Sequence, residues 1–211
     1  MRPPADFTAM VPAECDRRDV YKLLLSSVLP RPIALVSTIS ADGAVNLAPF
    51  SFANAVCANP PAVMFSPANL GDGSAKDTVR NLREVGEFVF NVVPHDMKDA
   101  MNETSAPYPP GVSEFEATGL TPLPSRFVRP PRVAESPVQM ECKLLQIVPI
   151  GDGPYAGNVC IGEVVCFHVA SGFQLSDGSL DPAKLDLIGR AGGSQYVTTR
   201  DRFSMDRPKP L

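Results

Sequence analysis

RPIALVSTISADGAVNLAPFSFAN, residues 31–54, is the stretch that decides the fold. Residues 32–39 are rich in apolar and β-branched side chains, which favour an extended strand. Asp42-Gly43 is a dipeptide typical of a tight turn between paired strands. Residues 45–52 then lead away from the turn, so the stretch predicts a β-hairpin.

Further β-type runs follow along the chain. They share an apolar, β-branched composition and have turn residues at their ends. We expect strands at 61–66, 88–93, 138–148 and 158–169, and a short strand at 195–199. Residues 151–154, Gly-Asp-Gly-Pro, are predicted to form the turn between the two long runs.

Three helices are expected, all at the periphery of the fold. Residues 17–28 have the apolar spacing of an amphipathic helix. A second helix is predicted to open with Ser74 as its N-cap and to stop at Gly86, and a short third helix at 95–103. The strands do not alternate evenly with helices, so a doubly wound parallel sheet fits poorly. The sequence favours a mainly β protein, built as a closed or partly closed antiparallel barrel.

The whole chain, 1–211, is predicted to form a single domain, with residues 1–16 as an N-terminal extension. Its 44% apolar and 20% charged residues are ordinary for a globular protein with a sizeable core. Prolines number 23 and cluster between 107 and 137. Because proline fixes φ and lacks an N–H, 105–137 is predicted to be a long ordered surface loop rather than helix. The apolar residues expected to anchor it are Phe115, Leu120, Phe127 and Val133.

Charge and cysteine usage disfavour several classes of protein. The net charge is −4 and no basic run occurs, so a nucleic-acid partner is not expected. The five cysteines form no C-x-x-C pair, and Cys160 and Cys166 are interpreted as small buried apolar residues. The two histidines, His95 and His168, are far apart in the sequence, so no metal site is predicted.

The location of the protein in the cell is predicted from the absence of a signal peptide and of a membrane span. The first residues, MRPPADFTAM, lack the apolar core and cleavage pattern of a signal peptide. No stretch approaches the ~18 apolar residues that a membrane span requires. We therefore expect a cytoplasmic protein with no membrane partner.

No strong catalytic template is present: the chain lacks a dinucleotide-binding glycine fingerprint, a phosphate-binding P-loop and a nucleophile elbow. A redox protein whose cofactor does the chemistry needs none of them. Hydroxyl, amide and cationic side chains do gather at strand ends and at a helix start, which attracts phosphate. They are Ser37, Thr38, Asn46, Ser51, Asn54, Lys76 and Thr78. The same residues could instead end strands, form turns or cap the helix.

In order and spacing, the chain resembles the flavin-reductase-like FMN-binding split-barrel family, on its flavoredoxin side. The segments that carry the resemblance lie at 31–38, 46–52, 59–61, 76–78, 86–88, 134–137, 161–164 and 188–190. It covers roughly residues 20–207. It implies a Greek-key split β-barrel that forms a homodimer and holds FMN at or near the subunit interface.

The residues that match the flavin-contacting regions of the family are then expected to bind the cofactor. They are Arg31, Ser37, Thr38, Asn46, Leu47, Ala48, Pro49, Ser51, Phe52, Asn54, Lys76, Thr78 and Arg190, the last with Gly192 and Gly193. Leu47, Ala48, Pro49 and Phe52 would supply apolar walls for the flavin ring. Lys76 and the helix start would attract its phosphate. The glycine-rich segment 67–74 is longer than a minimal loop and could reshape the phosphate end or the nicotinamide approach.

The resemblance implies an NAD(P)H:flavin reductase that transfers hydride from NADH or NADPH to FMN, including the role of reductase component for a partner monooxygenase. His168 is the candidate on the nicotinamide side, although a histidine on an apolar strand can equally be a core or interface residue. Two alternatives stay open. One is an electron carrier with tightly bound FMN and no nicotinamide activity, and the other is a non-redox protein that uses the pocket for another ligand.

Overall fold

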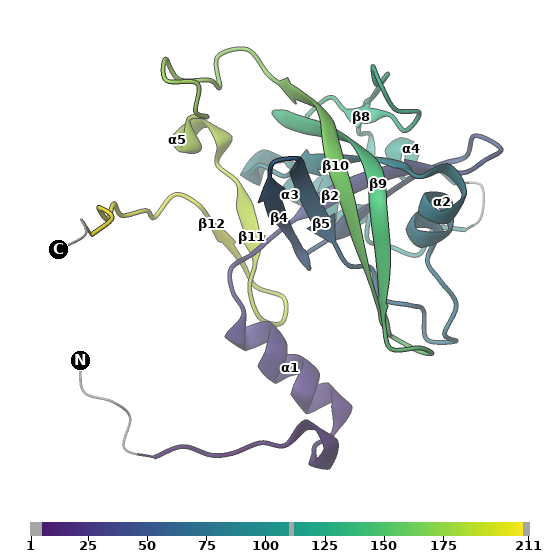
Figure 1. The fold of residues 1–211 in the computed structure, drawn as a ribbon, viewed down its shortest axis with the longest axis vertical. Helices are drawn as coiled ribbons and strands as arrows, with labels where there is room; N and C mark the ends of the chain where they lie inside the picture. Colours follow the sequence, from purple (N-terminus) through teal and green to yellow (C-terminus); the bar gives the residue numbers. More distant parts are fainter. Residues whose placement is uncertain (1–5, 110–111, 209–211) are drawn as a thin grey trace.

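The computed structural model describes residues 6–109 and 112–208, and its centre is a curled antiparallel sheet (Figure 1). Within these residues the sheet has seven strands in the order β3-β2-β6-β9-β10-β5-β4. Their bounds are β2 Ala34–Ile39, β3 Val45–Phe50, β4 Ala53–Ala58, β5 Pro61–Phe65, β6 Glu87–Val92, β9 Val138–Ile150 and β10 Gly157–Val169. The predicted hairpin, the four longer predicted strands and the turn at 151–154 are confirmed.

The sheet closes on itself because its two edge strands are neighbours in the chain. Only Ser51 and Phe52 separate β3 from β4. Side chains from all seven strands meet inside, where the rings of Phe50 and Phe88 each lie 5.2 Å from that of Phe65. Gly162 of β10 permits this packing, since a Cβ there would lie 2.3 Å from the Phe88 ring. The fold is therefore mainly β with a barrel core, as predicted.

Helix α2, Asp77–Val85, covers one opening of the barrel with Leu82. It ends at Gly86, which has φ of 72° as a C-cap glycine should. The prediction that Ser74 is its N-cap is wrong: the N-cap is Lys76. Ser74 instead donates from its N–H and its hydroxyl to Asp72 Oδ1, at 2.8 and 2.7 Å, so the turn before the helix uses it.

The Pro-rich segment 105–137 packs on the outer face of β2 and β3, where Phe115, Leu120 and Val133 are buried. Two expectations for it are wrong. The segment contains helix α4, Glu114–Thr118, because 112–121 is free of proline, and Phe127 is half-exposed instead of buried. The segment also holds the short strands β7, Pro122–Leu123, and β8, Arg132–Val133. Pro110 and Gly111 lie outside the described residues.

Helix α1, Arg17–Ser27, confirms the predicted amphipathic helix, yet it packs little against its own barrel. It projects away from the sheet, as Figure 1 shows. None of its described side chains is buried, and Leu23 and Leu24 are about half-exposed. The predicted extension, 1–16, is described from residue 6 and includes the turn η1, Pro12–Glu14. An apolar helix face therefore lies open in the single chain.

A small separate sheet lies between α1 and the barrel. It is formed by β1, Arg31–Pro32, β11, Ile188–Arg190, and β12, Tyr196–Thr198, the last confirming the strand expected at 195–199. The helix expected at 95–103 appears as η2, His95–Met97, followed by α3, Lys98–Glu103, and α5 spans Pro182–Leu185. Pairing of β1 with β11 sets Arg31 opposite Arg190, and the candidate functional site lies there.

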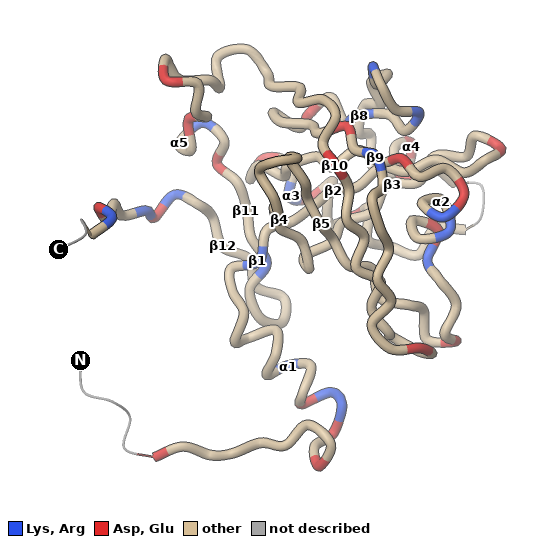
Figure 2. Tube along the Cα trace, in the orientation of Figure 1, with Lys and Arg blue, Asp and Glu red and all other residues tan. Residues whose placement is uncertain are grey.

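Figure 2 shows acidic and basic residues mixed along the chain, with no long basic stripe. Across residues 6–109 and 112–208, no helix combines the length and apolar character needed to cross a membrane.

Candidate functional site

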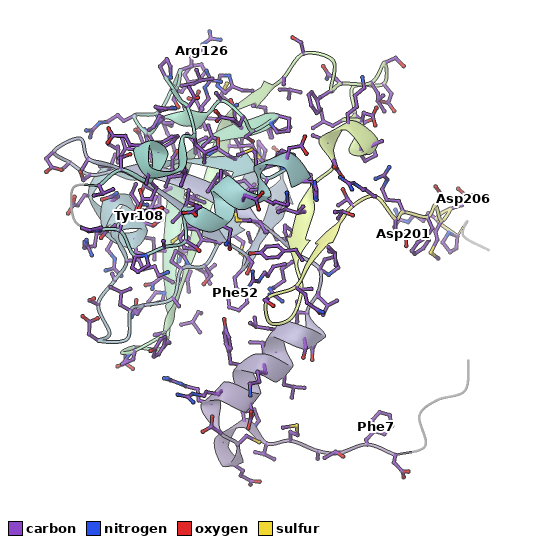
Figure 3. All side chains as sticks on the ribbon, turned by 180° about the vertical axis from the view of Figure 1, so that it is seen from behind. Phe7, Phe52, Tyr108, Arg126, Asp201 and Asp206 are labelled. Carbon is purple, nitrogen blue, oxygen red and sulfur yellow. The ribbon has the colours of Figure 1, made fainter. Side chains whose placement is uncertain are left out.

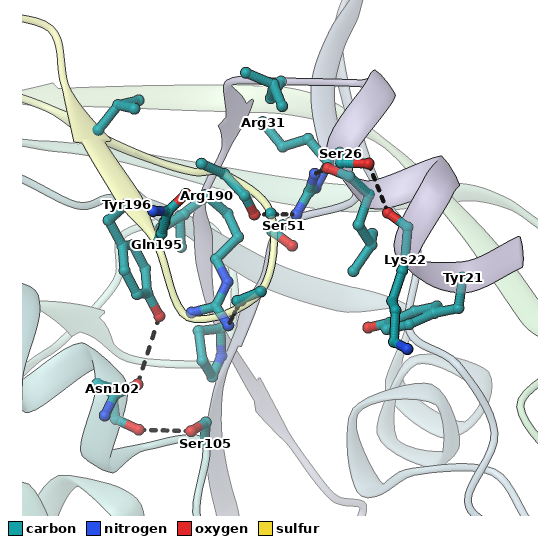
Figure 4. A pocket seen from close by; sticks show the side chains of 18 of the residues that line it. Tyr21, Lys22, Ser26, Arg31, Ser51, Asn102, Ser105, Arg190, Gln195 and Tyr196 are labelled. Carbon is teal, nitrogen blue, oxygen red and sulfur yellow. Dashed lines mark hydrogen bonds between the residues drawn. The ribbon is translucent and has the colours of Figure 1, made fainter. Parts of the chain in front are cut away.

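A cavity of about 910 Å³, the large cavity, lies between α1, α3, the end of β3 and the β11–β12 hairpin. Figure 4 shows Tyr21, Lys22 and Ser26 of α1 on one side and Arg190 and Tyr196 of the hairpin on the other. Its volume is at the upper end of the range of about 300–1,000 Å³ that is usual for small-molecule sites.

Arg31 is the most constrained residue of this cavity. Its side chain is only 5% exposed, and its Nη1 donates to the carbonyl oxygens of Leu25 and Val28 at 2.6 and 2.8 Å. Nη2 donates to Ala191 O at 3.1 Å, while Nε has no partner among the described residues. The first two carbonyls end α1, where a cation is favourable. Arg31 thus joins α1 to the hairpin and keeps one buried N–H unused.

The cavity is positively charged because Arg31 and Arg190 donate to backbone carbonyls and have no acidic partner among the described residues, whereas Lys22 is paired with Asp19. Arg190 donates from Nη2 to Gly193 O at 2.7 Å, and its guanidinium lies 4.4 Å above the Tyr196 ring. Burial lowers the pKa of Arg31, and the nearby charge of Arg190 lowers it further against a raising effect of Tyr21. Within the described chain, no carboxylate lines the cavity. Two guanidiniums side by side without a counter-ion favour an anionic ligand.

The structure brings only part of the predicted site residues to this cavity. They are Arg31, Pro49, Ser51, Arg190, Gly192 and Gly193. Pro49 and Ser51 come from the end of β3, and Arg190 comes from β11, more than 130 positions later. The small sheet is what joins these distant segments.

A second group of predicted residues forms a buried polar cluster at the start of α2. Asn46 Nδ2 donates to the hydroxyls of Thr38 and Thr78 at 3.3 and 3.0 Å, and Asn81 Nδ2 donates to Thr38 at 3.1 Å. Ser37 is also buried, and its hydroxyl donates to Pro131 O. These side chains satisfy one another, and Thr38 and Thr78 are at most 1% exposed.

The remaining predicted residues lie near the β3–β4 corner. Leu47 is buried on the outer face of the barrel, and Ala48 packs against the inner core. Phe52 is exposed and lies 5.9 Å from the Arg31 guanidinium; Figure 3 shows it on the side of the barrel that faces α1. Lys76 is exposed, with Nζ 6.0 Å from the Phe50 ring. Asn54 is exposed too, on β4, and accepts the N–H of Ala55.

His168 lies in β10, outside the residues that line the large cavity. Its Nε2 is 2.6 Å from Oε1 of Glu141, which is fully buried and accepts the backbone N–H groups of Arg126 and Phe127 at 2.7 and 2.5 Å. Cys166 Sγ lies 3.5 Å from the same Nε2, so Cys166 is a half-buried polar contact, whereas Cys160 is buried as predicted.

The ligand atoms of Glu141, Cys166 and His168 lie within 4.8 Å of one another, a spacing that a metal ion could use. However, Oε1 and Sγ both face one nitrogen, and 2.6 Å is the length of a charge-assisted hydrogen bond. We interpret these three residues as a structural cluster, called the clamp below, in which Glu141 fixes the backbone of residues 126–127 through two hydrogen bonds. Burial raises the pKa of Glu141, but the two N–H donors and His168 outweigh it and hold that pKa below its ordinary value.

Sequence reasoning missed the residues that α1 and α3 contribute to the large cavity. They are Tyr21, Lys22, Leu25 and Ser26 of α1 and Met101 and Asn102 of α3, with Ser105 just after α3. On the sequence these are ordinary positions of short helices. Tyr196 was also missed. Its position three residues after Gly193, in a segment already expected to approach the cofactor, was a signal that could have identified it.

Fold and cavity together define a class: a mainly β barrel with a cationic pocket large enough for a nucleotide. Residues 25–181 match the flavin reductase-like domain, and the chain belongs to that family. Component B of nitrilotriacetate monooxygenase from Bacillus cereus is 38% identical, with a TM-score of 0.91 over 96% of this chain and 100% of that one.

Two further structures are similar to this chain. The 2-nitrobenzoate 2-nitroreductase NbaA of Pseudomonas fluorescens is 28% identical, with a TM-score of 0.85 over 97% of this chain and 98% of that one. A split-barrel protein from Shewanella frigidimarina, a candidate flavin reductase, is 25% identical. Its TM-score is 0.80 over 93% of this chain and 96% of that one. The fold is therefore a split barrel of the flavin reductase type.

Proposed function

We propose that this protein is an FMN-binding NAD(P)H:flavin reductase. The observation that carries the proposal is the pair Arg31 and Arg190 in a nucleotide-sized cavity that, in the described chain, has no acidic lining. Membership of the flavin reductase-like family supports flavin as the anionic ligand. Similarity to component B of a monooxygenase supports a role as the reductase component of a two-component system.

The residues present fit FMN by their chemistry. A phosphate requires donors and positive charge, which Arg31, Arg190 and Ser51 offer, and a flat ring requires apolar walls such as Pro49 and Ile33. The buried Nε of Arg31 is an unused donor within this set. FMN, when bound, supplies the hydride-accepting chemistry. The protein then binds and orients it and excludes water around it, with no acid or base required of the chain.

The other predicted site residues take different parts in the proposal. Ser37, Thr38, Asn46 and Thr78 support β2, β3 and α2 from within and act as positioning residues. Leu47 and Ala48 pack the strand that carries Pro49.

Phe52, Asn54 and Lys76 are exposed at the β3–β4 corner, where they would contact FMN from outside the large cavity. His168 stays a candidate for the nicotinamide side only if a second copy brings it there, because its own chain places it outside the large cavity.

We also propose a homodimer, formed as a single domain per chain in the cytoplasm. Apolar side chains that are about half-exposed, Leu23, Leu24 and Val28 at α1 and Val56 on the edge strand β4, support it. Such a surface is unusual for a monomer and typical of an interface. Light scattering after size exclusion should give twice the chain mass of 22.6 kDa.

The test is an anaerobic absorption spectrum of the protein with FMN, before and after NADH or NADPH. Bleaching of the flavin band by either nucleotide supports the reductase and names its donor. A bound flavin that only dithionite bleaches would make the protein an electron carrier. Failure to bind FMN at all would contradict the proposal and leave a different ligand for the large cavity. Arg190→Gln should weaken FMN binding, whereas Lys143→Gln, an exposed change on β9, should not.

A further inference from the structure

A register shift between β9 and β10, which lie side by side in Figure 1, decides which side chains share a face. Val164 pairs with Cys142, and both pack in the barrel core. Alternation along a regular strand would place Cys166 on that same inner face. The shift falls between Val164 and Cys166, and it pairs Cys166 with Glu141 instead. Cys166 and His168 therefore lie on the face of Glu141, outside the core cluster.

The register shift brings three different ligand types together: a thiol, an imidazole and a carboxylate. Cys166 Sγ lies 3.5 Å from His168 Nε2, and the same nitrogen lies 2.6 Å from Glu141 Oε1. Within residues 6–109 and 112–208, no fourth cysteine, histidine or carboxylate joins the three. The His168 side chain is 24% exposed and that of Glu141 is fully buried, so an ion from solvent would enter on the β10 side.

The distances within the clamp can be compared with those of a tetrahedral zinc site. Zinc bonds of about 2.3 Å to sulfur and about 2.1 Å to nitrogen and oxygen separate sulfur from nitrogen by about 3.5 Å, and nitrogen from oxygen by about 3.4 Å. The first separation is already present between Cys166 and His168. The second requires the His168 ring to move about 0.8 Å from Oε1. The partly exposed ring can do so while two backbone N–H groups hold Glu141 in place.

We propose that Glu141, Cys166 and His168 form a zinc site, with water as the fourth ligand. In the metal-free chain, a proton on Nε2 joins His168 to Glu141, and zinc takes the place of that proton. The neutral ring then carries its single proton on Nδ1, and Cys166 binds as a thiolate after losing its thiol proton to solvent. Thiolate and imidazole ligands favour zinc over magnesium or calcium.

The bound ion would connect β9, β10 and, through Glu141, the backbone of residues 126–127. Its role is therefore to stabilise this end of the barrel. None of the three ligands lines the large cavity, so the inference is independent of the proposed reductase function.

The experiment uses the full-length protein after treatment with EDTA and desalting. Calorimetry measures zinc binding, and a difference spectrum with Co²⁺ in place of zinc reports the ligands directly, because a thiolate bound to cobalt gives a charge-transfer band in the near ultraviolet. Cys166→Ser removes the proposed thiolate. Cys57→Ser, which changes an exposed cysteine on β4, is the matched control. Circular dichroism verifies that both variants fold.

The expected result is one zinc ion per wild-type chain, a thiolate–cobalt band, and a higher Tm with zinc than without it. Cys166→Ser should lose the band, bind zinc at least about tenfold more weakly and show no rise in Tm. His168→Gln should also weaken zinc binding at least about tenfold. Cys57→Ser should bind zinc within about twofold of the wild type.

No binding to the wild type at about 100 μM zinc, or a cobalt spectrum without the thiolate band, would overturn the inference even if Cys166→Ser failed to fold. Equal zinc affinity in wild type and Cys166→Ser, or loss of binding in Cys57→Ser, would also overturn it because the ion would then lie elsewhere. FMN binding, measured separately, tests the proposed function and does not depend on any of these outcomes.

Discussion

The Thr38–Asn46–Thr78–Asn81 cluster and the Arg31–Arg190 pair are two polar regions of the same protomer, and they differ in how their polar groups are satisfied. In the cluster, amide donors and hydroxyl acceptors pair with one another behind α2. In the large cavity, the guanidiniums donate to backbone carbonyls, and Arg31 Nε donates to no described atom.

The contrast shows which polar residues are available to a ligand. A buried amide or hydroxyl that already has its hydrogen-bond partners gains little from a ligand, because the ligand would have to replace those partners. A cation held by carbonyls keeps its full charge and gains from an anion. Thr38 and Arg31 both belong to the residues that match the family, yet of the two only Arg31 keeps a donor without a described partner, and only Arg31 lines the large cavity.

The largest effect is expected for Arg31→Met, which removes the guanidinium that has a donor without a described partner. The carbonyls of Leu25 and Val28 lose their donor, so the free energy of unfolding should fall by about 3 kcal/mol. FMN affinity should fall at least about tenfold. Urea denaturation and fluorescence titration measure the two effects.

Arg31→Lys is the control for that variant. It keeps the charge but not the fork of donors, so it should recover part of the FMN affinity and little of the stability. Equal FMN binding by wild type and Arg31→Met would show that the buried arginine serves the fold alone.

Glu141→Gln tests a polar cluster that contains a charge and whose members are hydrogen-bonded to one another. It should lower the free energy of unfolding by about 2 kcal/mol near neutral pH, because the bond from His168 is weakened in a buried site. FMN affinity should not change. His168→Gln should give a similar loss, and a change in FMN affinity without a loss of stability would place this clamp at the flavin site.

The stability difference between wild type and Glu141→Gln should depend on pH in a definite direction. The pKa of Glu141 is depressed in the folded chain, so its contribution is complete above the unfolded value of about 4.3 and is lost as the pH falls through the lower folded value. Stability curves of wild type and Glu141→Gln should therefore converge below about pH 4.3. Parallel curves down to pH 3 would contradict the assignment.

Thr38→Val should have an intermediate effect on stability and almost none on the ligand. The Thr38 hydroxyl accepts from both Asn46 and Asn81, so its removal should cost about 1–2 kcal/mol. Thr78→Val removes an acceptor of a single bond and should cost about half as much. FMN affinity within twofold of wild type confirms that the cluster acts on position only, whereas a large loss of affinity in a stable variant would refute it.

The smallest effect is expected for Lys22→Gln, on the exposed rim of the large cavity. Lys22 is paired with Asp19 at the surface, so stability should change by less than about 0.5 kcal/mol. FMN affinity should fall about two- to threefold at low salt, and the difference should vanish near 1 M salt, where charges are screened beyond about 3 Å. Lys143→Gln serves as the control, and an equal effect there would indicate a general charge effect.

Much of the fold followed from local signals. Asp42-Gly43 produced the hairpin, and Gly86 ended α2, because each needs only its own backbone conformation. The wrong expectations depended on neighbours. Ser74 could either cap the helix or hydrogen-bond to Asp72, and the sequence alone did not show which of the two interactions is more stable. The strand β4, Ala53–Ala58, was not predicted: the expected hairpin ended at residue 52, and the next strand was expected only at 61–66.

The structure brings some of the predicted site residues together, and their binding of a cofactor stays a prediction. Arg31 and Arg190 were both expected to bind the cofactor, and the pairing of β1 with β11 sets them opposite each other. Lys22 and Tyr21 could not be foreseen, because their role depends on where α1 lies relative to a hairpin some 170 residues away.

Strands, turns and helix ends are properties of short segments, so the order of residues was enough to place most of them. Whether a polar side chain is spent on its neighbours or left for a ligand depends on contacts between segments far apart in the chain. Thr38 and Arg31 are alike in sequence context, both close to one strand. Folding buries the first among matching amides and leaves the second facing a cavity, and that difference comes from long-range packing.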